Sequence, residues 1–492
     1  MIPKGAFTPD RLSLTVGFGT PTELFILSSR CSGLRSLARL LLVSWQMQWR
    51  IAVAVHVVYV RRETDTPAHA SRAPLPHPPL SLSLTIIYIP SFLPFPFFPV
   101  NLIVGWINAY TEGGWLPKWG SPGYRGGMTG SMGDNALGDA IVKREVIDKY
   151  YPGLNYNTAM KALLQDALTI PPNAATSDDR YWGVGRVALK SYLEHGYIAY
   201  GDNGTSPPTE PVDQIVSRAL NYYLSDYAIG LAAKSLGEAD EDDAMRSHLG
   251  TISDDMLARA ANYSKLLEPN TKFMRVRNPD GTFLEPFDEF GWGPPGYTEG
   301  GPWQYRFYAP HDALGLATLY GDGDASSSNL CDMLQNAQTT PSIYHFGGYG
   351  HEIHEMSEMA LYCWGQYEHD NQPVHHMLWM FIASDRDGVG GKCAQKGQAW
   401  IRKAMTELYV PGTTDGAMFA GDEDNGQLAA WLVLAASGLY QLAPGNTHYT
   451  LGTPLFESVT LHIGGKGYDG KAGATTINIV AHAGIYLFHW IV

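Results

Sequence analysis

The sequence predicts a mainly α-helical protein, an incomplete α/α toroid of helix hairpins that closes in a short β-rich carboxy-terminal tail. Three observations favour this fold class. Segments with apolar side chains every three to four residues follow one another from residue 134 onward, which is the period of one helix face. Long loops rich in Gly, Pro and aromatic residues separate these segments, and such loops are usually functional. No sequence repeat of the length found in open solenoids stands out.

The periodic segments give the predicted helices in chain order. In the strongest of them, Ile215, Ala219 and Leu220 lie on one stripe and predict a long helix followed by an antiparallel partner. The predicted helices cover residues 134–150, 211–233, 241–267, 311–320, 354–368, 372–382, 397–408 and 427–440. Alternation typical of β-strands is confined to residues 455–463 and 476–483.

Composition divides the chain into two parts. Its 492 residues are 45% hydrophobic and 17% charged, which excludes a disordered chain and allows a large core. The net charge of −14 argues against a nucleic-acid-binding protein. Residues 1–104 hold nine Lys and Arg against four Asp and Glu, so the remainder of the chain carries a net charge of −19. We therefore expect a boundary near residue 104.

The amino-terminal segment does not have the pattern of a folded domain. Residues 73–111 carry no charged side chain, but four prolines between Pro90 and Pro99 would break a membrane-spanning helix. Residues 1–30 lack the order of a signal peptide. A membrane anchor, a disordered extension and non-coding sequence translated from a wrong gene model all fit, and the abrupt boundary favours the third. We expect a low-order leader at 1–104, a toroid domain at 105–463 and a truncated β tail at 464–492.

Two aromatic loops carry candidate sugar-binding residues. In the first, Glu112, Trp115 and Trp119 combine a carboxylate with rings that can stack on a sugar, although buried structural tryptophans explain the same pattern. In the second, Glu299 lies among glycines and aromatic residues shortly before Trp303. Apolar surroundings raise the pKa of a carboxyl group, which suits a general acid. The following His311-Asp312 pair could bind substrate, or Asp312 could simply cap a helix.

An acidic loop precedes the helix predicted at residues 427–440. Asp422, Glu423 and Asp424 are consecutive carboxylates that repel one another unless a cation lies nearby. Part of this charge is explained by capping of the helix amino terminus. The excess indicates a hard cation such as Ca²⁺, which binds oxygen ligands.

Amide and imidazole side chains supply a further candidate site. Asn371 and Gln372 offer the amide oxygens that suit Ca²⁺. His351 and His354 resemble part of a zinc-protease motif, but position 355, where the second histidine would stand, is Glu. At a spacing of three residues the two histidines could still share a helix face and a metal. The four cysteines form no C-x-x-C pair and predict nothing. Carboxylates, amides and aromatic rings on the long loops of a helical toroid together indicate carbohydrate hydrolysis by two carboxyl groups.

Five motifs occur in an order that resembles a known family. They are Glu112-Gly-Gly-Trp-Leu-Pro-Lys-Trp119, Trp303-Gln-Tyr with Pro310-His-Asp312, Asn371-Gln-Pro-Val-His-His376, Gly421-Asp-Glu-Asp-Asn-Gly-Gln427, and Pro444-Gly with Tyr449 and Gly452-Thr-Pro-Leu-Phe456. With them, residues 108–463 resemble the α-mannosidases of glycoside hydrolase family 92. The resemblance implies a Ca²⁺-dependent, exo-acting and inverting enzyme that removes terminal, often α-1,2-linked, mannose from N-glycans or mannans. It also favours a secretory route.

The resemblance also implies roles for individual residues. Glu299 would be the general acid, and Asp422 or Asp424 the general base. Asn371 and Gln372 would belong to the Ca²⁺ site. Glu355 and Glu358 would lie next to these ligands without binding the ion directly. Trp115, Trp119, Trp303 and His311 would line the sugar pocket.

This chain departs from the family at its amino terminus. The family carries an amino-terminal β-sandwich and a Trp-Asp-Thr-Phe-Arg motif, and residues 1–104 contain neither. The chain is therefore similar to the carboxy-terminal two-thirds of a family member. The alternative to an active mannosidase is a catalytically impaired remnant that still binds mannose.

Overall fold

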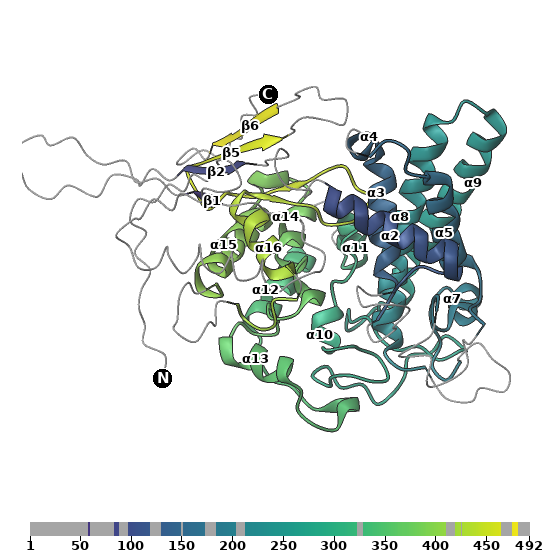
Figure 1. Ribbon diagram of the computed structural model, residues 1–492. Coiled ribbons are helices and arrows are strands. Elements are labelled where there is room, and N and C mark those ends of the chain that lie inside the picture. Colours follow the sequence, from purple (N-terminus) through teal and green to yellow (C-terminus); the bar gives the residue numbers. More distant parts are fainter. Residues whose placement is uncertain are drawn as a thin grey trace, which may run out of the picture.

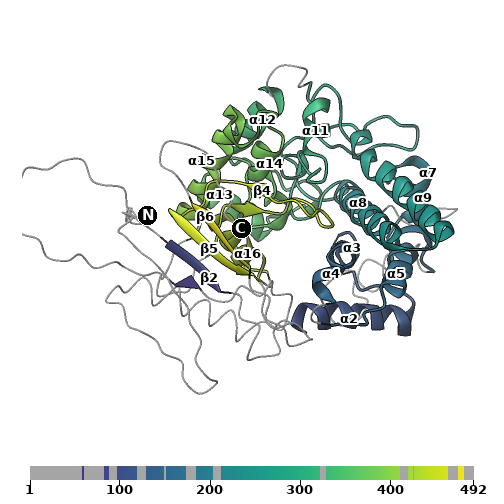
Figure 2. The ribbon, with the colours of Figure 1, turned by 90° about the horizontal axis from the view of Figure 1, so that it is seen from above.

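The computed structural model describes residues 58–59, 83–87, 97–118, 129–148, 151–172, 184–202, 212–321, 328–409, 419–424, 426–463 and 475–480. Helices dominate these residues and follow an arc from α2 and α5 through α8 and α9 to α12 and α15 (Figures 1 and 2). The prediction of a mainly helical toroid with a short β-rich tail is confirmed.

The helices of the first half of the arc pack around α8. They are α2 (Phe97–Gly113), α3 (Met132–Val142), α4 (Arg144–Ile147), α5 (Tyr156–Leu168), α7 (Leu189–His195), α8 (Ile215–Ala239) and α9 (Asp243–Ala260), which the 3₁₀ turn η1 (Ala261–Lys265) extends. Helices α8 and α9 form the predicted hairpin, and Asp242 starts α9 by accepting the backbone N–H of Ala244 at 2.8 Å. The two helices approach so closely at Gly230 that a side chain there would clash with Leu257.

The second half of the arc carries the shorter helices. They are α10 (Pro302–Tyr305), α11 (Ala313–Leu319), α12 (Ser328–Thr339), α13 (His354–Tyr362), α14 (Met377–Ala383), α15 (Lys392–Glu407) and α16 (Gln427–Ala436), with the 3₁₀ turns η2 (Gly347–Tyr349), η3 (Gln372–Val374) and η4 (Gly388–Gly390). A disulfide joins Cys331 of α12 to Cys393 of α15, a pairing that the cysteine spacing did not predict.

Strands lie at one end of the arc. A four-stranded sheet has the order β1 (Val58–Tyr59), β2 (Ser83–Ile87), β5 (Ser458–Ile463) and β6 (Thr475–Val480). Strands β5 and β6 are the two predicted strands and pair antiparallel, with Val459 opposite Ile479 in a small apolar core. Strand β2 pairs parallel to β5. A separate pair joins β3 (Leu439–Tyr440) to β4 (Thr450–Leu451).

Two hydrophobic cores share α8. Val216 and Leu220 near its start face the larger core, which also contains α14 and α16, whereas Ile229 and Ala233 face the smaller core with α3 and α5. All four side chains are fully buried. Burying a Val, Leu or Ile side chain stabilises a protein by about 1.5–3 kcal/mol, so α8 anchors both halves of the arc.

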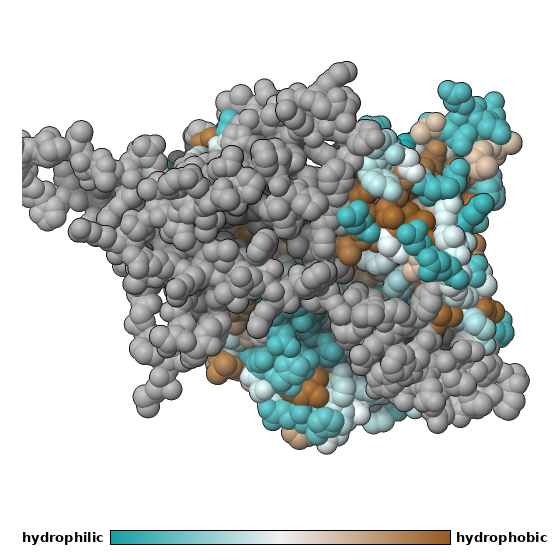
Figure 3. Space-filling model, viewed as in Figure 1, coloured by the Kyte–Doolittle hydropathy of each residue, from teal (hydrophilic) through white to brown (hydrophobic). Residues whose placement is uncertain are grey.

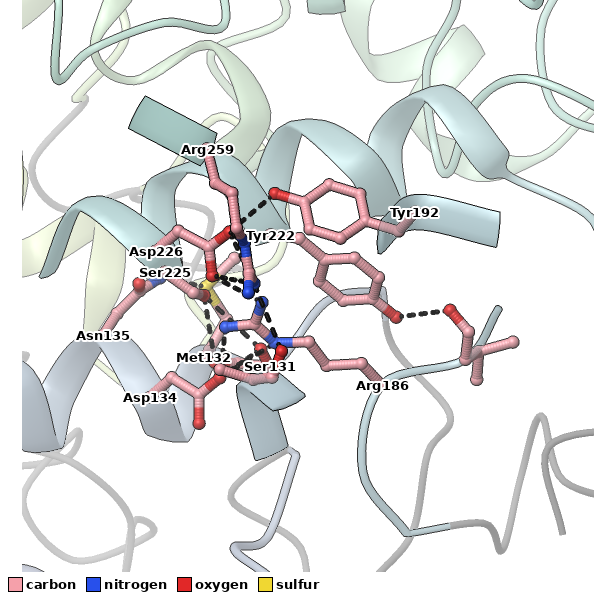
Figure 4. A network of polar contacts seen from close by, with 12 residues as sticks. Ser131, Met132, Asp134, Asn135, Arg186, Tyr192, Tyr222, Ser225, Asp226 and Arg259 are labelled. Carbon is pink, nitrogen blue, oxygen red and sulfur yellow. Dashed lines mark hydrogen bonds and ion pairs between the residues drawn. The ribbon is translucent and has the colours of Figure 1, made fainter. Parts of the chain in front are cut away.

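A buried ion-pair network crosses the first half of the arc and consists of Asp134, Arg186, Asp226 and Arg259. Arg186 lies between the two carboxylates, with Nη2 3.0 Å from Asp134 and Nη1 2.7 Å from Asp226. Arg259 binds Asp226 at 2.8 Å, and the Tyr192 hydroxyl donates to Asp226 at 2.8 Å (Figure 4). Opposite charges are matched here, so the network joins α3, α8 and α9.

Several predicted boundaries need correction. The helix predicted at 354–368 ends at Tyr362, because Cys363 takes the left-handed conformation. The helix predicted at 372–382 begins only at Met377, after the 3₁₀ turn η3 that contains Pro373. The helix predicted at 427–440 ends at Ala436, and its last two residues form β3.

Other elements were not predicted or cross a predicted boundary. Helices α5, α7 and α12 were missed, and Lys143 divides the segment predicted at 134–150 into α3 and α4. Helix α2 runs through the composition boundary at residue 104. No helix among the described residues is long and apolar enough to cross a membrane.

Candidate active site

The loop before α10 holds Glu299 in a fixed and unusual conformation. Thr298, the residue before it, is bound at three points: its N–H donates to Ser217, its carbonyl accepts from Tyr305, and its hydroxyl accepts from Thr129 at 2.7 Å. Glu299 itself has a φ of +43°, in the left-handed region that residues other than glycine rarely adopt. Such strained residues persist where the surrounding structure holds them, and they cluster at functional sites.

Polar groups surround the backbone and the carboxyl group of Glu299. Its N–H donates to the Tyr349 hydroxyl at 2.7 Å, and its carbonyl and Oε2 each accept from the Asn371 amide at 3.2 Å. Burial raises the pKa of Glu299, and the charges of Glu355 and Asp424 raise it further, against the opposing effect of the Asn371 hydrogen bond. A carboxyl group with a raised pKa can hold a proton for a leaving group.

Asn371 and Gln372 join the two candidate catalytic loops. The Asn371 amide nitrogen binds Glu299, and the Gln372 amide nitrogen donates to Oδ2 of Asp424. Asn371 also accepts the N–H of Gln372 through Oδ1 at 2.8 Å, which fixes the relative orientation of the two side chains. Because the amide nitrogens face the carboxylates, the Oε1 of Gln372 and the second lone pair of Asn371 Oδ1 remain available to a cation.

The three carboxylates before α16 have different surroundings. Glu423 caps the helix by accepting the N–H groups of Gly426 and Ala429. Asp422 is exposed, 3.7 Å from Nε2 of His354. Asp424 has a φ of +55°, and partial desolvation raises its pKa, while the Gln372 hydrogen bond opposes that rise. Capping therefore accounts for Glu423 and leaves Asp422 and Asp424 as candidates for the general base.

An acidic cluster lies behind these loops and consists of Glu355, Glu358, Glu368 and Asp370. Neither carboxyl oxygen of Glu368 or of Asp370 has a hydrogen-bond partner, although both side chains are buried. Burial raises the pKa of Glu368 well above its usual range and that of Asp370 to about 8. A methyl group at Gly421 would lie 2.5 Å from Cβ of Asp370 and 2.6 Å from Oε2 of Glu358, so the Asp422 loop lies directly on the cluster.

The chemical types of the donors in this cluster suit a hard cation. Unpartnered carboxylate oxygens and adjacent amide oxygens are the ligands that Ca²⁺ binds, and a bound cation would favour their ionised forms. The surface around α13, which carries Glu355 and Glu358, is largely hydrophilic (Figure 3). Glu368 and Asp370 were not among the site residues predicted from the sequence. A signal was available, because residues 307–385 contain ten Asp and Glu and no Lys or Arg.

The histidines of the zinc-like motif do not share a helix face. Helix α13 begins at His354, so His351 lies outside it, and His354 contacts Glu355 at 3.2 Å. Among the described residues, the group of acidic and histidine side chains close enough to share one ion lies elsewhere, at Glu194, His195 and Asp202. The structure gives the zinc interpretation no support.

The predicted residues of the second aromatic loop lie in packed surroundings. Trp303 is buried against Phe273, and its indole nitrogen has no hydrogen-bond partner. His311 packs on Tyr227 and Tyr263 and contacts the carbonyl of Ala260 at 3.1 Å. Asp312 caps α11 through the N–H of Gly315, the simpler of the two predicted roles. Direct binding of sugar by these three residues stays a prediction.

The predicted residues of the first aromatic loop differ in burial. Glu112 is exposed near the end of α2, and Trp115 is buried against Gly185. Trp119 lies outside the described residues. The structure thus brings together Glu299, Asn371, Gln372, Asp422 and Asp424, and it places Trp115, Trp303, His311 and Asp312 in other packed regions.

Carboxyl groups on neighbouring loops of a helical toroid supply the pair of acidic groups that glycoside hydrolysis uses. The model of the glycosyl hydrolase family 92 catalytic domain matches residues 99–486. The chain therefore belongs to glycoside hydrolase family 92.

Solved structures and a curated protein are similar to the chain. The family GH92 inverting mannosidase BT2199 from Bacteroides thetaiotaomicron is 29% identical with a TM-score of 0.58, over 80% of this chain and 46% of that one. The α-mannosidase BT3965 of the same organism, solved with mannoimidazole, is 26% identical with a TM-score of 0.58, over 78% and 43%. An uncharacterized secreted glycosidase of Arthroderma benhamiae is 25% identical over 377 residues, which are 72% of this chain and 41% of that protein. The chain thus spans less than half the length of these relatives.

Proposed function

We propose that this protein is a Ca²⁺-dependent, exo-acting α-mannosidase that hydrolyses terminal α-1,2-linked mannose of N-glycans or mannans with inversion. The main observation in support of the proposal is that the dipeptide Asn371-Gln372 contacts two loops that carry carboxyl groups. Asn371 binds Glu299 on one loop and Gln372 binds Asp424 on the other. Inversion requires two carboxyl groups held about 6.5–9.5 Å apart, so that a water molecule fits between base and sugar. Family membership and the mannosidases among the similar structures support mannose as the sugar.

The two carboxyl groups would divide the reaction between them. Glu299, whose pKa burial raises, would donate its proton to the departing glycosidic oxygen as the bond to the anomeric carbon breaks. Asp424 or Asp422 would take a proton from the water that attacks the opposite face of that carbon. Products are mannose with inverted configuration and the shortened glycan.

Calcium would be held by oxygens of Glu368, Asp370, Asn371 and Gln372. The unpartnered carboxyl oxygens of Glu368 and Asp370 support this assignment. When bound, Ca²⁺ would supply positive charge that binds sugar hydroxyls and stabilises the ionised carboxylates. The protein's own contribution is to place the two amide side chains next to each other, since η3 carries Gln372 directly after Asn371.

A secretory route is part of the proposal. The buried Cys331–Cys393 disulfide supports it, because disulfides persist mainly in oxidising compartments. The name of the Arthroderma relative, a secreted glycosidase, points the same way.

Release of mannose from α-1,2-mannobiose tests the proposed function. We expect turnover that complete chelation with EDTA abolishes and added Ca²⁺ restores. Activity that survives chelation would remove calcium from the proposal. Calorimetry with mannoimidazole distinguishes an active enzyme from the alternative, an impaired remnant. Binding without turnover would identify a mannose-binding remnant. Parallel assays with α-1,3- and α-1,6-mannobiose decide the linkage.

A further inference from the structure

The peptide groups on both sides of Glu299 are held by side chains from two other segments. Asn371 binds the carbonyl, and Tyr349, in the 3₁₀ turn η2, accepts the N–H at 2.7 Å. A left-handed glutamate is unfavourable in isolation, so these two contacts oppose its relaxation to an ordinary conformation. Asn371 already has a predicted role, whereas Tyr349 has none.

Tyr349 is attached to the Glu299 loop at two points. Its ring lies on Gly293, where an added Cβ would come within 2.5 Å of the ring carbon Cδ2. Its hydroxyl binds the other end of the loop at Glu299. The backbone around η2 holds the ring in place, because Gly348 donates its N–H to the carbonyl of Trp292 at 2.8 Å. Tyr349 therefore contacts both ends of the loop from Gly293 to Glu299.

The hydroxyl of Tyr349 also faces the acidic side chains. Burial raises its pKa to about 12; the hydrogen bond with the Glu299 N–H opposes the rise, and the charges of Glu299, Glu355 and Glu368 add to it. The phenol therefore keeps its proton at neutral pH. Because the oxygen accepts from the Glu299 N–H, this proton remains to be donated within the site.

We propose that Tyr349 is a positioning residue that fixes the backbone of Glu299 and thereby aims its carboxyl group at the glycosidic oxygen. The inference rests on the proposed function, in which Glu299 is the general acid. General acid catalysis requires the acid within hydrogen-bond reach of the oxygen that it protonates. A small displacement of such a group is costly, since reacting atoms must be held within about 3–3.5 Å.

The test compares Tyr349→Phe with Tyr344→Phe. The first removes the acceptor for the Glu299 N–H and keeps the ring on Gly293. The second removes a hydroxyl from the same segment that binds Glu352 instead. With Tyr349→Phe we expect kcat on α-1,2-mannobiose to fall roughly 10–100-fold with little change in KM, because a buried N–H loses its partner. An aryl mannoside with a good leaving group should lose much less, since it needs little protonation.

Exchange measurements separate positioning from simple packing. Hydrogen exchange at the Glu299 amide should be faster in Tyr349→Phe and unchanged in Tyr344→Phe. Should Tyr349→Phe fail to fold, 3,5-difluorotyrosine at position 349 weakens the acceptor at nearly constant size and should lower kcat on mannobiose alone.

The following outcomes would contradict the inference. Equal losses on both substrates, or equal behaviour of the two Phe variants, would overturn the role of Tyr349 while leaving the proposed function intact. If the unaltered protein binds mannoimidazole without turnover, the affinity of the Tyr349→Phe variant replaces kcat, and unchanged affinity overturns the inference. A protein with neither turnover nor binding would lose the proposed function, and this inference with it.

Discussion

Two regions of buried charge in this molecule differ in how their charges are matched. In the ion-pair network, Arg186 and Arg259 face Asp134 and Asp226 at 2.7–3.0 Å, and the side chains of Arg186 and both aspartates are fully buried. In the acidic cluster, Glu368 and Asp370 are also buried, yet none of their four carboxyl oxygens has a hydrogen-bond partner. A basic group beside that cluster is His354, an exposed imidazole that contacts Glu355 and Asp422.

The difference separates a structural use of charge from a functional one. Buried opposite charges in direct contact hold helices in register and need no ligand. Buried like charges raise one another's pKa and persist where binding or catalysis uses them. We therefore expect the two regions to respond differently when one ionisable side chain of each is replaced by an uncharged one.

Neutralising the proposed acid should give the largest effect. Glu299→Gln keeps the shape of the side chain but cannot donate the proton, so kcat on α-1,2-mannobiose should fall about 10²–10⁴-fold. Substrates with good leaving groups should be largely spared. The exposed Glu352→Gln serves as the control in the same steady-state assays. A loss of equal size on both kinds of substrate would show that Glu299 is not the acid.

Breaking the ion-pair network should mainly affect stability. Arg186→Met leaves Asp134 without its cation and Asp226 with one arginine fewer, which should cost about 3–5 kcal/mol in the free energy of unfolding. Denaturant unfolding followed by circular dichroism measures this change. Lys190→Met, which breaks an exposed pair with Glu194, should leave the unfolding midpoint unchanged. A midpoint for Arg186→Met close to that of Lys190→Met would contradict a structural role for the network.

Neutralising the acidic cluster should leave the calcium-free protein nearly as stable as before. Burial and the neighbouring carboxylates raise the pKa of Glu368 and so favour its uncharged form, and Glu368→Gln replaces it with an uncharged side chain of similar size. The variant should instead lose most of the stabilisation that Ca²⁺ provides, about 2.7 kcal/mol at a hundredfold excess over Kd. Thermal melts with and without Ca²⁺ measure both effects. An unchanged calcium response would place the cation elsewhere.

A smaller effect is expected in the pH dependence of stability and of the response to calcium. Asp370 has a folded-state pKa of about 8 against an ordinary value of 3.8, so its contribution to stability is present below pH 4 and is lost as the pH rises toward 8. Cation binding requires the ionised form, and the rise in Tm on adding Ca²⁺ should be larger at pH 8 than at pH 5.5. Asp370→Asn should reduce this pH dependence. A calcium response independent of pH would argue against ionisation of the buried carboxyls on binding.

Much of the fold follows from local pattern. The hairpin of α8 and α9 was predicted because its apolar residues repeat at the helical period. The short α7 and the amphipathic α12 were missed, and the predicted helix at 354–368 was too long because nothing in its sequence marks Cys363 as left-handed. Tertiary contacts decide such positions, since a local propensity is too weak to do so.

The site was only partly visible in the sequence. Glu299, Asn371, Gln372 and the Asp422–Asp424 loop were predicted from their residue types and their resemblance to a family, and the structure brings them together. Trp303 and His311 had the same kind of support, but their neighbours are core side chains. An aromatic ring serves packing as readily as sugar binding, so its type alone cannot identify its role.

The sequence by itself determined the class of protein, the helical repeat and the excess of carboxylates in residues 307–385. The tertiary structure alone decided which carboxylates are matched by arginine and which are left without partners. It also decided that Tyr349, fifty residues away along the chain, contacts the backbone of Glu299. The physical reason is that charge, burial and hydrogen bonding depend on distances across the fold, whereas composition and periodicity depend only on neighbours along the chain.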